Sequence, residues 1–247
     1  MIKLVPEFVE TKNVRRFSVM AADLLAYQEG CLACVAGTPG VGKTKTSRIL
    51  GARNNWVYLR IASIWKRSEL DFIQAFAREV GIAMPPARKG RCYAEVVDRL
   101  TGSGRIVVLD EMQRLPREFL NIALDISDAT ACPFILVGEP ELKGMMEYNK
   151  RVWSRTHRLF EFEPLSLADV LLYAHKTAEL ALQPEIAAIL HKSSGGDFRI
   201  LKRDFIALVN FANANGPGPD GQPQITAEMA KIAVSQGLKG TGNGNGR

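Results

Sequence analysis

The chain has 247 residues, and its 32 lysines and arginines against 26 aspartates and glutamates give a formal net charge of +6. Hydrophobic residues make up 47% and charged residues 23%, a balance that excludes low-complexity disorder for most of the chain. The sequence has no run of about 20 apolar residues that would span a bilayer, and its mixed N-terminus is not a secretory signal. We therefore expect a cytoplasmic protein with no membrane partner. The modest positive charge permits a polyanionic partner without requiring one.

Apolar runs alternate with helical patterns as far as residue 164, which favours an α/β core around a mostly parallel sheet. The first helix is expected over 14–29, with Val19, Leu24 and Leu25 on its apolar side. A loop is expected at 85–91, where Pro85 and Pro86 precede a basic stretch. Strands are expected at 31–36, 56–61, 105–109, 133–137 and 160–162, and further helices at 43–53, 67–81, 93–100 and 117–128.

The chain changes character after residue 164, where only helical patterns remain. Ser166 and Asp169 stand at the positions of a capping box, and Thr226 is expected to cap the last helix. A Gly/Pro loop is expected at 213–224, and the Gly/Asn-rich end is expected to be disordered. The predicted organisation is an α/β domain over 1–164, a small helical domain over 165–236 and a tail over 237–247.

The four cysteines are too few and too scattered for a disulfide framework. Cys31 and Cys34 form a CxxC pair, which leaves a zinc or redox role open. They lie in the apolar run GCLACVAG, however, without a second CxxC and without a histidine nearby. Because a free cysteine packs like a small hydrophobic residue, we predict that both are buried in a strand.

The segment GTPGVGKT follows the first expected strand and matches the phosphate-binding pattern G-x-x-x-x-G-K-[ST] at every defined position. Glycines let backbone N–H groups converge on phosphate oxygens, and the N-terminus of the following helix adds a positive dipole. Lys43 is expected to neutralise the β- and γ-phosphates, and Thr44 to offer its hydroxyl to Mg²⁺. The alternative is a tight strand–helix connection without a ligand. The expected nucleotide-binding residues are Gly37, Thr38, Pro39, Gly40, Val41, Gly42, Lys43 and Thr44.

The apolar run IVVL at 106–109 ends in two acids, Asp110 and Glu111. Asp110 is suited to hold the hydration shell of Mg²⁺, as the aspartate of a Walker B motif does. Glu111 is suited to polarise an attacking water, which needs a carboxylate near the γ-phosphate. The alternative is a polar strand end that meets solvent. Together with the glycine-rich loop, the acid pair predicts nucleotide binding and hydrolysis.

The acid pair and the helical domain after the core resemble the AAA+ group of ATPases, whose cofactors are ATP and Mg²⁺. The segment GGDFR at 195–199 resembles the sensor-2 signature of that group, which implies that Arg199 approaches the γ-phosphate. The sensor-1 position, usually Asn, Ser or Thr, is occupied by Gly138 and Glu139, and Glu139 is the candidate for that role.

The segment WSRTHR at 153–158 resembles the part of AAA+ proteins that carries an arginine finger. Such a finger completes the site of a neighbouring subunit, so the resemblance implies a homo-oligomer. Arg155 is favoured by its distance from Pro164, and Arg151 and Arg158 remain alternatives.

Within the AAA+ group, the chain resembles the DNA-transposition ATPases, which include the B protein of phage Mu and TnsC. The resemblance spans residues 7–236 and is carried by FVETKNVRRF, DEMQRLP and FILVGEPEL. It implies a P-loop core with a helical lid, and ATP-dependent assembly on duplex DNA without sequence preference. It also implies delivery of that DNA to a transposase. The N-terminal DNA-binding helical domain of the Mu protein is expected to be missing.

Basic residues that this interpretation assigns to DNA are found at two places. Phosphate contacts are independent of sequence and weaken as salt rises, and solubilising charge is the alternative for each residue. An alternative function is an assembly or motor ATPase that acts on protein partners, because VGEPEL also resembles the ExeA-type secretion ATPases. A third possible function is a P-loop switch with slow hydrolysis, but Glu111 argues against this function. The candidate DNA contacts are Lys66 and Arg67 after the second strand, and Arg88, Lys89 and Arg91 in the basic loop.

Overall fold

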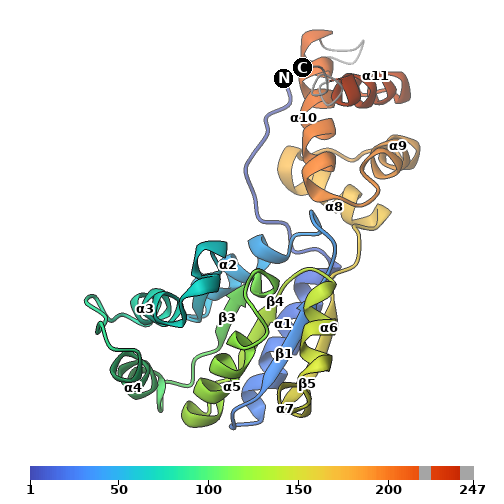
Figure 1. Cartoon of the computed structure of the whole chain (residues 1–247). Coiled ribbons are helices and arrows are strands. Elements are labelled where there is room, and N and C mark those ends of the chain that lie inside the picture. The colour runs from blue at the N-terminus through green and yellow to red at the C-terminus, as the bar shows by residue number, and fades with distance from the viewer. Residues whose placement is uncertain (217–223, 240–247) are drawn as a thin grey trace, which may run out of the picture. The chain divides into compact units, whose positions relative to one another are not determined.

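The structure is a computed structural model that describes residues 1–216 and 224–239 (Figure 1). Its internal contacts divide the chain into two compact units, which are treated separately below. The α/β unit comprises residues 14–38 and 42–162, and the helical unit comprises residues 1–13, 39–41 and those from Glu163 onward. The contacts thus group the N-terminal segment with the helices, whereas the sequence places it with the core. In the described residues, no helix combines the length and the apolar character that crossing a membrane would need.

A five-stranded parallel sheet with the strand order β2–β3–β4–β1–β5 forms the centre of the α/β unit. The register places Val35 beside Val137 and Val137 beside Asp110, so β4 lies between the strand before the P-loop and the strand that ends in the acids. The predicted parallel-sheet α/β core is confirmed. The strands are β1 Leu32–Ala36, β2 Val57–Arg60, β3 Val107–Asp110, β4 Phe134–Val137 and β5 Thr156–Glu161.

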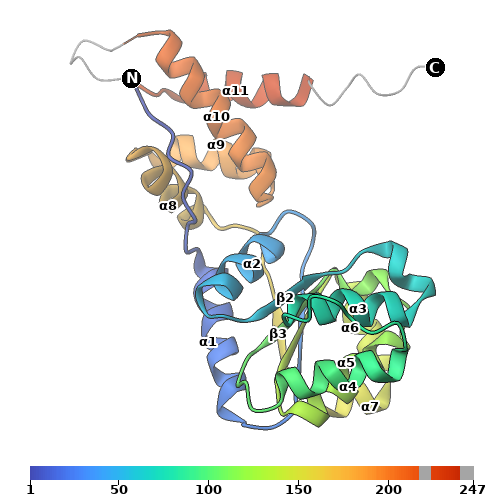
Figure 2. The same cartoon turned by 90° about the vertical axis from the view of Figure 1, so that its left-hand side faces the viewer.

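Helices cover both faces of this sheet, with α1 and α2 on one side and α3 to α7 on the other (Figure 2). The larger apolar cluster lies on the second side, where Phe72 and Phe76 of α3 pack with Phe134 of β4. The helices are α1 Lys12–Ala26, α2 Lys43–Arg53, α3 Glu69–Glu79, α4 Lys89–Leu100, α5 Phe119–Thr130, α6 Glu141–Tyr148 and α7 Lys150–Ser154, with short 3₁₀ segments η1 Ser63–Arg67 and η2 Met112–Arg114.

The face of α1 that packs on the sheet agrees with the prediction at Leu24 and differs from it at Val19 and Leu25. Val19 and Leu25 are 63% and 42% exposed, whereas Phe17 and Leu24 are fully buried. The ring of Phe17 contacts that of Phe160 edge to face, with the centroids 5.9 Å apart. It contacts the ring of Phe162 in a tilted geometry, with the centroids 5.7 Å apart. The larger apolar surface of Phe17 thus determines which side of the helix faces the sheet.

Two other expectations are wrong. Lys89 and Arg91 lie in the first turn of α4 and not in a loop. The fifth strand begins at Thr156, four residues before its expected start, and the two helices α6 and α7 precede it without having been predicted. The β5 strand gains its length because it pairs with all of β1, through a register shift near Leu32.

The helical unit contains four helices among the described residues: α8 Leu167–Ala178, α9 Pro184–Ser194, α10 Phe198–Ala214 and α11 Ala227–Lys239. The predicted capping box is present, because Asp169 N donates to Ser166 Oγ at 3.2 Å and Ser166 N donates to Asp169 Oδ2 at 3.0 Å. Thr226 caps α11 by accepting from Met229 N at 3.2 Å. The helix α11 includes the first residues of the predicted tail. The rest of that tail, 240–247, and residues 217–223 of the predicted Gly/Pro loop lie outside the described residues.

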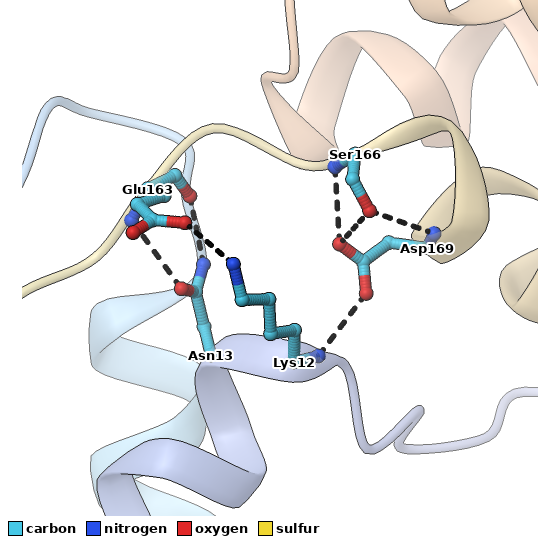
Figure 3. Close-up of polar contacts among 5 residues, drawn as sticks. All are labelled: Lys12, Asn13, Glu163, Ser166 and Asp169. Atoms are coloured by element: carbon cyan, nitrogen blue, oxygen red, sulfur yellow. Dashed lines mark hydrogen bonds and ion pairs between the residues drawn. The ribbon is translucent and has the colours of Figure 1, made fainter.

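The N-terminal segment of the helical unit has no helix or strand before Lys12, but side chains of that unit hold both of its ends. Ile2 N donates to Asn213 Oδ1 at 2.7 Å, and Asn213 Nδ2 donates back to Ile2 O at 2.9 Å. At the other end, Lys12 N donates to Asp169 Oδ1 at 3.1 Å, and Lys12 Nζ lies 3.2 Å from Glu163 Oε2 (Figure 3). Asp169 therefore caps α8 and holds the first residue of α1 with the same carboxylate.

Candidate nucleotide site

The loop between β1 and α2 has the backbone that phosphate binding requires. Gly40 and Gly42 have φ angles of +85° and +98°, in the left-handed region that favours glycine. Lys43 opens α2, and the N–H groups of a first helical turn have no partner within their own helix. The ammonium group of Lys43 donates to the carbonyl oxygens of Gly37 and Thr38, so it lies across the loop. A helix N-terminus with a cation beside it fits an anionic ligand.

Asp110 ends β3 on the sheet face that α2 covers. Its side chain is 1% exposed, and its Oδ2 accepts a hydrogen bond from the Tyr58 hydroxyl at 2.9 Å. The helix α2 packs on β2 and β3, and a Cβ added at Gly51 of α2 would lie 3.7 Å from Tyr58 Cβ. Two interstrand steps of about 4.8 Å each separate Asp110 from β1, a span of about 10 Å. Asp110 thus lies at the sheet edge and on the sheet face from which the P-loop leaves.

Glu111 follows Asp110 with a φ of +65°, which is uncommon for a residue with a side chain. Its carboxylate accepts from Gln113 Nε2 at 3.0 Å and lies 3.3 Å from Arg114 Nε and 3.4 Å from Arg60 Nη2. The side chain is 18% exposed. Both carboxylate oxygens of Glu111 therefore have donors in this structure, and Glu111 must leave them before it can accept a proton from water.

The donors at this edge suit a magnesium ion that arrives with phosphates. In the part of the chain that the structure describes, no group of three His, Cys, Asp or Glu residues is placed to hold a metal ion. Mg²⁺ commonly takes only one or two carboxylates and completes its shell with waters and phosphate oxygens. The hydroxyl of Thr44, in the first turn of α2, and the carboxylate of Asp110 fit such a shell.

Glu139 and Arg199, the other predicted nucleotide contacts, lie in different units. Glu139 follows β4 at the same sheet edge, where Gly138 N donates to Val35 O at 2.9 Å and keeps β4 paired with β1. Arg199 lies in the first turn of α10, and its side chain is 69% exposed. Its guanidinium group lies 3.2 Å from Asp197 Oδ2.

The tip of the P-loop, residues 39–41, packs within the helical unit. Phe198 N donates to Gly40 O at 2.9 Å, and a Cβ at Gly40 would overlap the carboxylate of Asp197. Asp197 caps α10 by accepting from Arg199 N at 2.7 Å. Asp197 is not among the predicted site residues, although an aspartate directly before a helical run is typical of an N-cap.

The three candidate finger arginines lie at the edge of the sheet opposite to the P-loop. The strand β5 runs parallel to β1, so its start at Thr156 lies at the edge where β1 also begins. Arg151 and Arg155 belong to α7 and its C-cap, and Arg158 lies within β5, which corrects its expected position before the strand. Each has an acid nearby: Arg151 Nη2 lies 2.6 Å from Asp125 Oδ1, Arg155 Nε 3.8 Å from Asp128 Oδ1, and Arg158 Nη2 3.9 Å from Asp23 Oδ2.

The candidate DNA contacts divide into paired and unpaired residues. Lys66 and Arg67 are exposed on η1, and Arg88 is the N-cap of α4; in the described ranges no ion pair holds any of the three. Lys89 Nζ lies 2.6 Å from Glu69 Oε2, and Arg91 Nε lies 3.4 Å from Glu95 Oε1. Acid partners reduce the attraction of Lys89 and Arg91 for a polyanion.

Cys31 and Cys34 are buried free thiols, as predicted, but only Cys34 lies in β1, and Cys31 directly precedes the strand. Burial raises the pKa of Cys31 to about 11 and that of Cys34 to about 12. Both thiols therefore keep their protons near neutral pH, whereas zinc binding and redox exchange need the thiolate.

The sheet order, the P-loop and the acid pair are those of the AAA+ fold, and residues 26–146, about half of the chain, match a family model described as an AAA domain. Two solved structures have the same fold. The ORC2 protein of Aeropyrum pernix superposes with a TM-score of 0.64 at 15% identity, over 95% of this chain and 69% of that one. Cdc6p of Pyrobaculum aerophilum superposes with a TM-score of 0.67 at 17% identity, over 94% and 69%. The chain has the AAA+ fold.

Within this class the chain is similar to the B proteins of Mu-like phages. It is 28% identical over 211 residues to the "Mu-like prophage FluMu DNA transposition protein B" of Haemophilus influenzae, which covers 81% of this chain and 72% of that protein. It is 30% identical over 146 residues to the "ATP-dependent target DNA activator B" of Escherichia phage Mu, which covers 59% of this chain and 46% of that protein. The chain thus matches less than half of the length of the Mu activator. The predicted resemblance to the transposition group is confirmed.

Proposed function

We propose that this chain is a Mg²⁺-dependent ATPase that binds duplex DNA without sequence preference when ATP is bound. It oligomerises on that DNA and delivers it to a transposase or activates the transposase. The proposal depends on one observation. The P-loop and the acid pair lie at the same edge of the sheet, in a chain that resembles a DNA transposition protein over most of its length. DNA and transposition enter from the names of the relatives, which are a "DNA transposition protein" and a "target DNA activator", and the transposase is the partner that the resemblance implies.

The nucleotide part of the proposal rests on the α/β unit. Residues 37–44 bind the phosphates, Lys43 neutralises their charge, and Thr44 and Asp110 hold the magnesium ion. Glu111 takes a proton from the attacking water once it is released from Gln113 and its arginine partners.

Three further roles in hydrolysis are proposed for residues away from the P-loop and the acid pair. Arg199, held by Asp197 at the start of α10, approaches the γ-phosphate, and Glu139 takes the sensor-1 position. Arg155 acts in the site of a neighbouring subunit, and its place at the sheet edge opposite to its own P-loop supports action in trans. Arg151 and Arg158 lie at the same edge and remain the alternatives.

The DNA part of the proposal rests on exposed basic residues. Lys66 and Arg67 on η1 carry positive charge that no acid of the described chain offsets, and they follow β2. Each phosphate contact adds about 0.9 to the slope of binding affinity against salt concentration on a logarithmic scale. Lys89 and Arg91 are weaker candidates because each has an acid partner.

A gel-shift assay of random duplex DNA with ATP, ADP or no nucleotide, at two salt concentrations, tests the proposal. We expect a shift only with ATP, and a weaker one at the higher salt concentration. Lys43→Ala should abolish the ATP-dependent shift, because the nucleotide is then not held. Lys66→Ala should weaken the shift and lower the salt slope by about 1, whereas the matched control Lys176→Ala, at an exposed position of α8, should leave both unchanged.

Two outcomes would contradict the proposal. Duplex binding that is equal in all nucleotide states would separate DNA binding from the P-loop. No shift in any nucleotide state, together with ATP hydrolysis, would favour the alternative of an assembly ATPase that acts on protein partners.

A further inference from the structure

A tyrosine hydroxyl holds the buried carboxylate at the end of β3. The Tyr58 hydroxyl donates to Asp110 Oδ2 at 2.9 Å, and Asp110 is 1% exposed. A carboxylate oxygen can only accept a hydrogen bond, so the Tyr58 hydroxyl is the donor.

The direction of this hydrogen bond follows from the sheet register. Arg60 pairs with Asp110, so Tyr58 lies two residues earlier on β2 and on the same face of the sheet. The hydroxyl reaches Asp110 from the β2 side, whereas β4, β1 and the P-loop lie on the other side of β3. The hydrogen bond occupies Oδ2 from the β2 side and leaves Oδ1 as the oxygen for a partner on the P-loop side of β3.

We propose that Tyr58 is a positioning residue for the metal site: it fixes the rotation of the Asp110 carboxylate, so that Oδ1 faces the Mg²⁺ that enters with ATP. This inference rests on the proposed function, because it names the residue that orients Asp110, which the proposed function places at the metal ion. Outer hydrogen bonds to a ligating carboxylate commonly change metal affinity by about 10- to 100-fold. Because Asp110 is proposed to hold the ion through its shell of waters, we expect the effect of Tyr58 at the lower end of this range, about tenfold.

Tyr58→Phe removes the hydroxyl and keeps the ring. The free Mg²⁺ concentration that gives half of the maximal ATPase rate should rise about tenfold, while the rate at saturating Mg²⁺ stays close to that of the original protein. Binding of a fluorescent ATP analogue should weaken in the presence of limiting Mg²⁺ and stay unchanged in EDTA. Tyr93→Phe is the matched control, because Tyr93 is a half-buried tyrosine of α4 that has no contact with Asp110 or Glu111. It should change neither measurement.

Three results would count against the inference or its basis. If Tyr58→Phe lowers the unfolding temperature but leaves the Mg²⁺ requirement unchanged, the hydroxyl only satisfies a buried carboxylate, and the inference fails. If Asp110→Asn and Thr44→Ala raise the Mg²⁺ requirement while Tyr58→Phe does not, the proposed function stands and only the role of Tyr58 fails. If none of the three variants changes the Mg²⁺ requirement, the metal site itself is wrongly assigned and both proposals fail.

Discussion

Replacing Gly40 with alanine tests the packing of the P-loop tip in the helical unit. A left-handed φ costs a residue with a Cβ about 1–2 kcal/mol, and Gly40 has a φ of +85°. The new Cβ would also overlap the Asp197 carboxylate, which must rotate away and lose its bonds to Arg199 N and Ile200 N. Loss of an N-cap costs about 1 kcal/mol. Gly40→Ala should therefore lower the free energy of unfolding by about 2–3 kcal/mol.

Gly42→Ala is the matched control for the backbone part of this cost. Gly42 has a φ of +98°, and a Cβ there would meet no atom within 4 Å. It should therefore cost only about 1–2 kcal/mol. The measurement is urea unfolding without nucleotide, followed by far-ultraviolet circular dichroism, because bound ligand would add its own stabilisation.

A double-mutant cycle with Asp197→Ala isolates the overlap. Asp197→Ala alone should cost about 1 kcal/mol through the lost cap, and its ion pair with the exposed Arg199 adds little. Combined with Gly40→Ala, the overlap no longer exists, so the two changes should cost about 1 kcal/mol less than their sum. Combined with Gly42→Ala, the costs should add. Equal costs for the two glycine variants, with additivity in both cycles, would refute the contact between Gly40 and Asp197.

Two further substitutions test the proposed catalytic roles. Glu111→Gln should lower ATP turnover by about 100-fold or more, because a positioned general base contributes that much, while ATP affinity stays close to the original; unchanged phosphate release would remove Glu111 from this role. Arg155→Ala should lower turnover, and mixing it with Lys43→Ala subunits should restore part of the activity, because each variant supplies the group that the other lacks. The same mixing with Arg151→Ala and Arg158→Ala identifies the finger, and no recovery in any mixture would argue against a site shared between subunits.

The parts of the fold that the sequence predicts well are those that depend on neighbouring residues. The helix expected over 43–53 is observed as Lys43–Arg53, because the phosphate motif marks its start and Asn54 ends it. The capping box of Ser166 and Asp169 is also predicted correctly, since both partners lie within one helical turn. Local rules of this kind need no knowledge of the rest of the fold.

The errors occur where distant residues decide. On α1, both Val19 and Phe17 belong to possible apolar stripes, and the choice of Phe17 depends on Phe160 and Phe162, more than 140 residues away. The strand β5 extends to Thr156 because it pairs along β1, which its own polar sequence THR does not indicate. The hydrogen bond from Tyr58 to Asp110 likewise depends on the register of two strands, which residue spacing in the sequence does not contain.

The acid pair shows how the site departs from a regular strand. In a continued strand, Asp110 and Glu111 would point to opposite faces of the sheet, and only one would face α2 and the P-loop. The strand ends at Asp110, and the left-handed φ of Glu111 turns the chain into η2 at the sheet edge. This backbone conformation is unfavourable for glutamate, and the contacts of its carboxylate with Arg60 and Arg114 help to hold it. Asp110, which we propose to hold the metal, thus stays in the core, and Glu111 is placed at the sheet edge with its side chain 18% exposed.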